Sequence, residues 1–283
     1  QAGKSGAASS QAASGAAAKS AAPQPAPPGG PDPCAAKVGT RKPQCRDALS
    51  TGGLGPFLAV ISKGEFQMGN KDVTQEQPVH RVAFAKPFAI AEFETSQAEY
   101  RLFCTETKRA CEAQPWTGDD LPVVRVNWQD ARDYVTWLSK VSGRNYRLAT
   151  EAEWEFAARS GGPALYPSGN ALAQTDAVFS GVTKPAAPAT RNRQMYVNTS
   201  RDNSPKLYHT IGNAREWVED AWSPNYAGAP DDGSARRSGD GALRVVRGGA
   251  YTDIAAKLRF TTREGIDSAT RDNVTGFRVV REL

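Results

Sequence analysis

The sequence predicts an α+β domain with little regular secondary structure, carried on an N-terminal tail that has no core of its own. Short apolar or alternating runs, separated by glycine and proline, predict strands early in the chain. Three capped segments with a helical spacing of apolar residues predict helices in its middle. Long stretches rich in glycine, proline and asparagine then show neither the alternation of a strand nor the apolar spacing of a helix. A few helices among short strands are typical of the α+β class.

The N-terminal tail is predicted to be a linker. Residues 1–33 contain no aromatic and no branched aliphatic side chain, so they bury too little apolar surface to offset the entropy lost on ordering. Residues 34–54 are interpreted as a short lead-in held by a cystine, and residues 55–283 as the folded domain. Because the chain begins with Gln1 and has no apolar run of membrane-spanning length, we expect an upstream segment, preferably a membrane anchor.

The basic residues are scattered along the chain, although its formal net charge is +5. No stripe of lysine and arginine alternates with aromatic residues in the way that would follow a phosphate backbone. The charge pattern therefore indicates a solvated surface, and no nucleic-acid partner is expected.

The four cysteines fall into two local pairs, Cys34 with Cys45 and Cys104 with Cys111. An even number of cysteines in short loops predicts two disulfides and an oxidising compartment, periplasmic or extracellular. Unpaired thiols and a metal site are the alternatives. A metal site is disfavoured because neither spacing is CxxC and only two histidines could complete it.

The first folded elements are predicted to be strands over residues 57–61, 65–68, 79–84 and 88–93, which are bounded by glycine and proline. The long segments 161–210 and 223–243 show no periodicity. Loops of such length in a compact domain are usually functional or held by bound ions.

Three helices are predicted from their caps. The first follows residues 95–96, which can cap it with a hydroxyl group. The second follows Asn127 and ends at Gly143, a typical C-terminal glycine. The third follows Thr150, where Glu153 three residues later completes a capping box.

Several short blocks, in order along residues 55–283, resemble the formylglycine-generating enzyme, or sulfatase-modifying factor, family. They are Gly64-Glu65-Phe66-Gln67-Met68-Gly69, Pro122-Val123-Val124-Arg125-Val126-Asn127-Trp128, Arg147-Leu148-Ala149-Thr150-Glu151-Ala152-Glu153-Trp154-Glu155, Gly212-Asn213-Ala214-Arg215-Glu216-Trp217, and Arg247-Gly248-Gly249-Ala250-Tyr251 followed by Gly276-Phe277-Arg278-Val279. The resemblance implies a fold related to C-type lectins, with buried aromatics and buried charges.

The family's copper-binding cysteines have no counterpart here. By the resemblance, Phe260 stands at one cysteine position and a residue near Ala255 at the other. Because a copper centre of this type needs facing thiolates, no copper is expected, and neither is copper-dependent formylglycine formation.

The resemblance implies calcium as a structural cofactor. By position, the first site would use the carbonyl groups of Thr210, Gly212 and Ala214, and the second the region of Asp176 and Ala177. Oxygen ligands on an irregular loop suit calcium. The side-chain ligand of the first site, however, falls on His209, whose neutral imidazole suits that ion poorly. Either the site is weakened, or Asp202 or Asn203 supplies the ligand instead. Alternatively, the side chains of Asn213 and Glu216 hydrogen-bond to the backbone and organise the turn with or without an ion.

The C-terminal segment concentrates positive charge in Arg247, Arg259, Arg263 and Arg278. One interpretation places a ligand-binding groove there, and its predicted residues are Arg259, Arg263, Phe260 and Trp217, with guanidinium groups suited to carboxylates. The alternative is a buried ionic lattice in which these arginines pair with Glu151, Glu153, Glu155 or Glu216. The lattice is preferred, and Arg259 is the arginine expected to reach a cleft.

Two functions follow from these observations. The first is a non-catalytic ligand-binding or sensor module, the extracytoplasmic part of a bacterial signalling protein such as a membrane Ser/Thr kinase. Its ligand would be a peptide, a protein or a small molecule, and any membrane contact would come through the upstream anchor. The second is a periplasmic tailoring oxidase resembling the pyoverdine-maturation enzyme, because relatives without the cysteines include such an oxidase. No nucleophile motif accompanies the two histidines.

Overall fold

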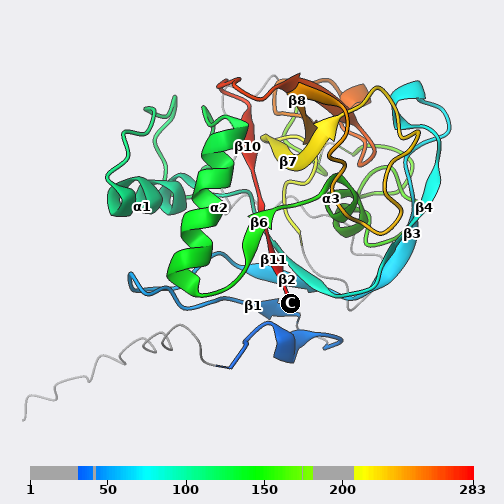
Figure 1. Cartoon of the computed structure of the whole chain (residues 1–283). Coiled ribbons are helices and arrows are strands. Elements are labelled where there is room, and N and C mark those ends of the chain that lie inside the picture. The colour runs from blue at the N-terminus through cyan, green and yellow to red at the C-terminus, as the bar shows by residue number, and fades with distance from the viewer. Residues whose placement is uncertain (1–30, 41–42, 174, 181–206) are drawn as a thin grey trace, which may run out of the picture.

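The computed structural model describes residues 31–40, 43–173, 175–180 and 207–283 as two β-sheets, a two-stranded ribbon and three α-helices (Figure 1). The strands are β1 (Gln44–Cys45), β2 (Leu58–Ile61), β3 (Gly64–Met68), β4 (His80–Phe84), β5 (Phe88–Ala91), β6 (Tyr146–Leu148), β7 (Arg215–Trp222), β8 (Asp240–Arg247), β9 (Arg263–Asp267), β10 (Thr275–Phe277) and β11 (Val279–Glu282). The helices are α1 (Gln97–Thr107), α2 (Trp128–Ser142) and α3 (Glu151–Ala158), with short 3-10 turns η1 (Ala35–Lys37), η2 (Thr74–Glu76) and η3 (Ala255–Lys257). The α+β prediction is confirmed.

The two sheets share the C-terminal segment of the chain. The larger sheet has the strand order β1-β2-β5-β11-β6 and is antiparallel throughout. The smaller has the order β10-β7-β8-β9, with β10 parallel to β7. Since only Arg278 separates β10 from β11, that residue lies where the chain passes from one sheet to the other.

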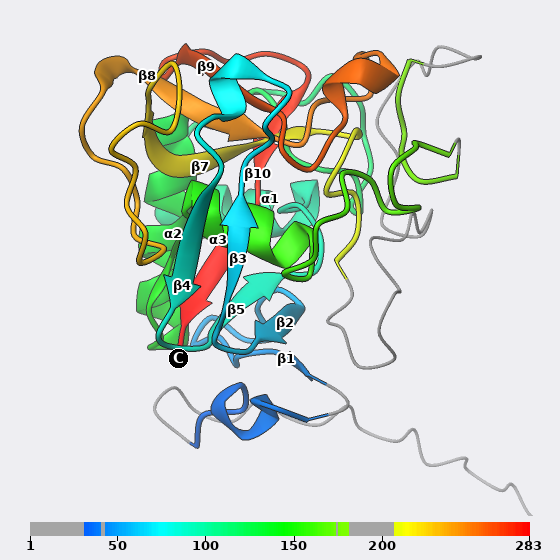
Figure 2. The same cartoon turned by 90° about the vertical axis from the view of Figure 1, so that its right-hand side faces the viewer.

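The helices and the ribbon lie on different sides of the molecule. Figure 1 shows α1 and α2 together on one side, and Figure 2 shows the β3–β4 ribbon in front of α3. The ribbon carries the paired aromatic rings of Phe66 and Phe84, which pack against Phe156 of α3. Contacts between aromatic rings thus help to stabilise a fold that has little regular secondary structure.

All three helices begin at the predicted caps. The side chains of Ser96, Asn127 and Thr150 each accept a hydrogen bond from the backbone three residues later, and each forms a complete capping box. Gly143 ends α2 in the left-handed conformation, which favours glycine because it has no Cβ atom. No helix within the described ranges is long and apolar enough to cross a membrane.

Both predicted disulfides are confirmed. Cys34 is bonded to Cys45, and Cys104 is bonded to Cys111, so all four cysteines of the chain are oxidised. The second bond joins the end of α1 to the loop that follows it. The thiol and metal alternatives are thereby excluded for the structure described here.

The predicted lead-in is joined closely to the domain. Its strand β1 extends the larger sheet by pairing with β2. The guanidinium group of Arg281, 1% exposed, lies 2.8 Å from both Asp32 and Asp47, and Asp47 also accepts a hydrogen bond from Tyr146. Asp32 belongs to the predicted linker 1–33, so folded structure begins slightly earlier than expected. Residues 1–30 of that linker lie outside the described residues.

Candidate functional site

Two arginines of the C-terminal segment lie in a buried ionic lattice. The guanidinium group of Arg247 donates hydrogen bonds to Glu151 at 2.7 Å, to Glu155 at 2.6 Å and to the carbonyl oxygen of Phe260 at 2.7 Å. Arg263 donates two more to Glu151, at 2.7 and 2.9 Å. The side chains of Arg247 and Arg263 are only 0% and 1% exposed. These pairs join β8 and β9 to the start of α3.

A second part of the lattice surrounds Glu216 of β7. Arg278 donates hydrogen bonds to both of its carboxylate oxygens, at 2.8 and 2.7 Å, and Trp154 donates to one of them at 2.8 Å. The remaining donors of Arg278 reach backbone carbonyl groups, including those of Ala91 and Tyr208. Because each charge is hydrogen-bonded and paired, burial is tolerated. The predicted lattice is present.

Two buried carboxyl groups in this region differ in their protonation. Burial favours the neutral form of Glu151, but the charges and hydrogen bonds of Arg263 and Arg247 outweigh it and lower its pKa to about 2. For Glu94, burial and the neighbouring charge of Glu216 raise the pKa to about 8. One carboxyl group is therefore a lasting anion, whereas the other is protonated near neutral pH.

The structure places most of the predicted ligand-binding residues in the interior. Phe260 and Trp217 are completely buried in the two hydrophobic clusters, and Arg263 is held by the lattice. None of these three side chains can be reached by a ligand in this conformation. Only Arg259 keeps some exposed surface, 19% of its side chain, and it pairs with Glu76 at 2.7 Å. Phe260 belongs to a hydrophobic cluster that also includes Ile90 of β5 and Val245 of β8.

The two regions predicted to bind calcium lie next to each other. An isolated parallel bridge between Val178 and Gly212 connects them. All five predicted ligand residues are buried: Thr210, Gly212, Ala214, Asp176 and Ala177. The sequence placed these residues in separate sites, and the fold brings them together. The alternative ligands Asp202 and Asn203 lie outside the described residues.

The turn after His209 is organised by its own hydrogen bonds. The side-chain amide of Asn213 donates to the carboxylate of Glu94 at 2.9 Å, whereas the ion-independent alternative expected a bond to the backbone. The carboxylate of Asp176 accepts hydrogen bonds from the hydroxyl group of Ser168 at 2.7 Å and from a backbone amide. Backbone carbonyl oxygens of such a turn fit calcium, but the imidazole of His209 and the engaged Asp176 do not strengthen the donor set. Calcium stays a prediction.

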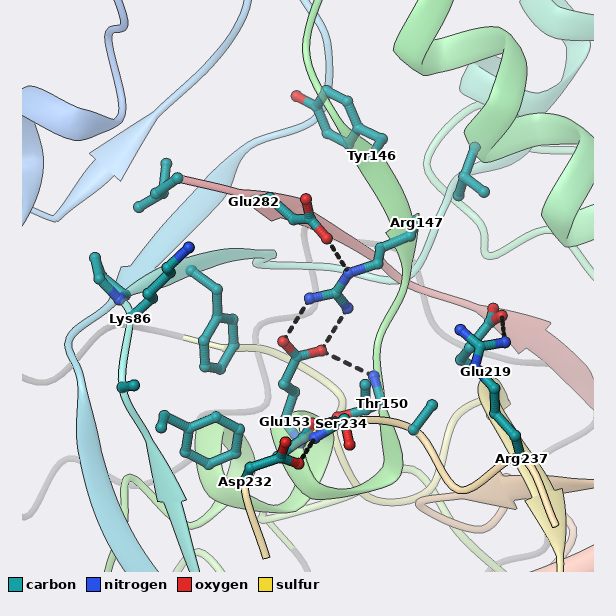
Figure 3. A pocket seen from close by; sticks show the side chains of 18 of the residues that line it. Lys86, Tyr146, Arg147, Thr150, Glu153, Glu219, Asp232, Ser234, Arg237 and Glu282 are labelled. Carbon is teal, nitrogen blue, oxygen red and sulfur yellow. Dashed lines mark hydrogen bonds and ion pairs between the residues drawn. The ribbon is translucent and has the colours of Figure 1, made fainter. Parts of the chain in front are cut away.

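A separate cavity of about 670 Å³ opens beside α2, β6 and the end of β11 (Figure 3). Its size is within the range of small-molecule sites. One wall is apolar and includes Phe84, Pro87 and Phe88, while the rest carries charges of both signs. The cavity combines an apolar surface with several polar groups, which is the usual composition of a ligand site.

Arg147, which lines this cavity, is held by several hydrogen bonds. It donates hydrogen bonds to both carboxylate oxygens of Glu153, at 2.6 and 2.7 Å, and to Glu282 at 2.9 Å (Figure 3). Burial alone would lower the pKa of Arg147, but these carboxylates raise it above its ordinary value. Arg147 therefore links β6, α3 and β11 rather than offering its charge to a ligand.

Glu219 lies on the other side of the cavity with two arginines. Its carboxylate is 3.5 Å from the guanidinium group of Arg132 and 3.9 Å from that of Arg237. Its side chain is 12% exposed, whereas those of Arg132 and Arg237 are 44% and 81% exposed. We call these three residues the Glu219 cluster.

Sequence reasoning did not find the Glu219 cluster. Arg237 is one of the basic residues scattered along the chain, and neither Arg132 nor Glu219 belongs to a recognisable motif. The three come from α2, from β7 and from the loop that follows β7. No spacing along the chain signals that they meet.

The comparisons with known proteins support one family. Residues 52–283 match the sulfatase-modifying factor enzyme 1-like domain. The chain is 29% identical to the formylglycine-generating enzyme of Streptomyces coelicolor over 77% of this chain and 87% of that protein. It is 32% identical to the serine/threonine-protein kinase pkn1 of Chlamydia pneumoniae, a match that covers 57% of this chain but only 24% of the kinase.

A solved structure gives the same result. PvdO from Pseudomonas aeruginosa is similar with a TM-score of 0.69 and 30% identity, over 81% of this chain and 95% of that one. The irregular α+β fold is the fold of the formylglycine-generating enzyme-like domains. The chain belongs to the sulfatase-modifying factor family.

Proposed function

We propose that this domain is a non-catalytic ligand-binding or sensor module and that it forms the extracytoplasmic part of a bacterial signalling protein such as a membrane Ser/Thr kinase. The position of Phe260 is the observation that carries the proposal. This side chain is fully buried where the resemblance places a family cysteine, and all four cysteines of the chain are in disulfides. Bonded sulfur atoms cannot act as thiolate ligands of copper.

Two further observations support the setting of the module. The similarity to a chlamydial serine/threonine kinase suggests that a domain of this type can accompany a kinase. The two disulfides are typical of an oxidising compartment, which favours a periplasmic or extracellular location. An anchor upstream of the predicted linker would then hold the module at the membrane surface.

The proposal is tested by offering the domain the family's reaction. The purified protein is incubated with copper, oxygen and a cysteine-containing sulfatase-motif peptide, and the peptide is analysed by mass spectrometry. We expect no conversion of its cysteine to formylglycine, while an active formylglycine-generating enzyme converts the peptide in parallel. Conversion by this domain would overturn the non-catalytic assignment.

A tailoring oxidase resembling the pyoverdine-maturation enzyme is the second candidate. The observation that favours it is the structural similarity to PvdO. The genes beside this one distinguish the candidates, because a siderophore cluster would favour the oxidase. A kinase domain and a transmembrane helix encoded upstream in the same reading frame would favour the sensor.

A further inference from the structure

The Glu219 cluster contains more positive than negative charge. It consists of two guanidinium groups and one carboxylate, so its formal charge is positive by one unit. At 3.5 and 3.9 Å the contacts to Arg132 and Arg237 are ion pairs longer than normal hydrogen bonds. The carboxylate of Glu219 is therefore shared between two cations and satisfies neither of them.

Both guanidinium groups keep donors available. A guanidinium group has five N–H donors in a fixed plane. Within the described part of the chain, the side chains of Arg132 and Arg237 make no hydrogen bond to a protein acceptor. Arg147 in the same cavity, by contrast, donates to two carboxylates and to the carbonyl group of Leu148. The difference separates a structural arginine from two that can still bind an anion.

Neighbouring residues hold the guanidinium group of Arg132 and the loop backbone beside Arg237. The guanidinium group of Arg132 lies 4.9 Å from the centre of the Trp128 ring, a favourable cation–π contact. Arg236, immediately before Arg237, donates to the carbonyl groups of Asn225, Ala227 and Ser238 and thereby fixes the loop. Positioned donors lose less entropy on binding than mobile ones.

We propose that this cavity binds a ligand carboxylate on the available donors of Arg132 and Arg237, with the apolar part of the ligand on the lining where Pro87 lies beside the largely buried rings of Phe84 and Phe88. The C-terminal residue of a peptide with an apolar side chain has this chemistry. Guanidinium groups match carboxylate oxygens in shape and charge. The inference rests on the proposed function, because it assigns the binding site of the proposed module.

The first test compares two probes that differ only in charge. N-acetylphenylalanine carries the carboxylate, and N-acetylphenylalaninamide replaces it with a neutral amide. In titration calorimetry on the whole chain, the acid should bind about tenfold more tightly than the amide, as expected for charge-assisted hydrogen bonds. Equal affinity for the two probes, or no binding of the acid, would overturn the proposal.

Variants connect that difference to the cluster. The double variant Arg132→Gln with Arg237→Gln should lose the preference for the acid. The matched control Arg81→Gln with Arg101→Gln removes two arginines that are each 60% exposed and lie outside the cavity, and it should keep the preference. Loss of the preference in both double variants would mean that net charge, rather than this site, attracts the acid.

Glu219→Gln tests whether the cavity binds an anionic or a cationic group. This change removes the carboxylate that competes for the two guanidinium groups, so the acid should bind more tightly than it binds to the wild type. If the cavity instead recognised an ammonium group through Glu219, the same variant would weaken binding, and the proposal would be wrong. Failure of these tests leaves the absence of formylglycine formation unaffected, whereas formylglycine formation would refute the proposed function without moving these affinities.

Discussion

The ionic lattice around Arg247 and the Glu219 cluster are built from the same residue types, yet they differ in burial and in bonding. Arg247 is completely buried, and it donates hydrogen bonds of 2.6 to 2.7 Å to two carboxylates and a carbonyl group. Arg237 is 81% exposed and lies 3.9 Å from one shared carboxylate. The hydrogen bonds of a buried arginine compensate for its lost hydration and must be kept in the folded state. An exposed arginine stays hydrated, so its N–H donors are available to other molecules.

The comparison indicates which arginines of this family member belong to structure and which can serve binding. The C-terminal segment of the sequence is rich in arginine. In the folded chain three of these arginines are consumed by Glu151, Glu155 and Glu216. The charge that remains available lies in a cavity on other elements.

Breaking the lattice should have the largest effect. Arg247→Met removes the shared partner of Glu151 and Glu155, and it leaves negative charge under-compensated in the core. Loss of one member of a buried ion pair costs about 3–5 kcal/mol, so the free energy of unfolding should fall by this amount in urea denaturation. Arg132→Gln is the matched change in the cavity, and it should cost less than about 1 kcal/mol. Similar losses in the two variants would contradict the distinction between the regions.

A smaller and pH-dependent effect should separate the two buried carboxyl groups. The folded-state pKa of Glu151 is about 2, below its ordinary value of 4.5, so its stabilisation is complete above that value and is lost as pH falls toward 2. The folded-state pKa of Glu94 is about 8, so its stabilisation is complete below 4.5 and is lost as pH rises toward 8.

Isosteric variants measure these opposite slopes. Glu94→Gln keeps an oxygen acceptor for Asn213 and removes the titration, so its stability relative to the wild type should improve between about pH 5 and pH 8. The deficit of Glu151→Gln should stay constant over that range and shrink below about pH 4. Denaturant unfolding at several pH values provides the measurement, and parallel curves for the two variants would contradict the assigned pKa directions.

The smallest effect concerns the turn after His209. If it binds calcium, excess calcium should raise the melting temperature, and chelator should lower it, because the ion binds only the folded state. His209→Asp should enlarge this shift, since a carboxylate is a better calcium ligand and aspartate tolerates the left-handed backbone found there, with φ of 55°. His209→Asn controls for the backbone change. Absence of a calcium shift in all three proteins would remove the metal from this turn.

Local features were predictable because they depend on residues close together in the chain. The capping boxes at Ser96, Asn127 and Thr150 involve residues three positions apart, and Gly143 ends its helix through its own backbone conformation. The disulfides close loops of 11 and 7 residues, so their partners could be chosen by proximity. The family blocks and the substitution at Phe260 are likewise visible in the sequence alone.

Only the tertiary structure decided which partner each arginine has and how deeply it is buried. Arg259 and Arg263 lie four residues apart, yet Arg259 pairs with the buried Glu76 and keeps 19% of its side chain exposed, whereas Arg263 pairs with Glu151 and is only 1% exposed. The partners are 183 and 112 residues away, and no local rule specifies contacts at such separations. The Glu219 cluster has the same origin, because α2, β7 and a loop must pack before its charges meet. The sequence thus determined the helix boundaries, the disulfides and the absence of the family's copper-binding cysteines. Burial in the folded chain determined which arginines keep exposed donors.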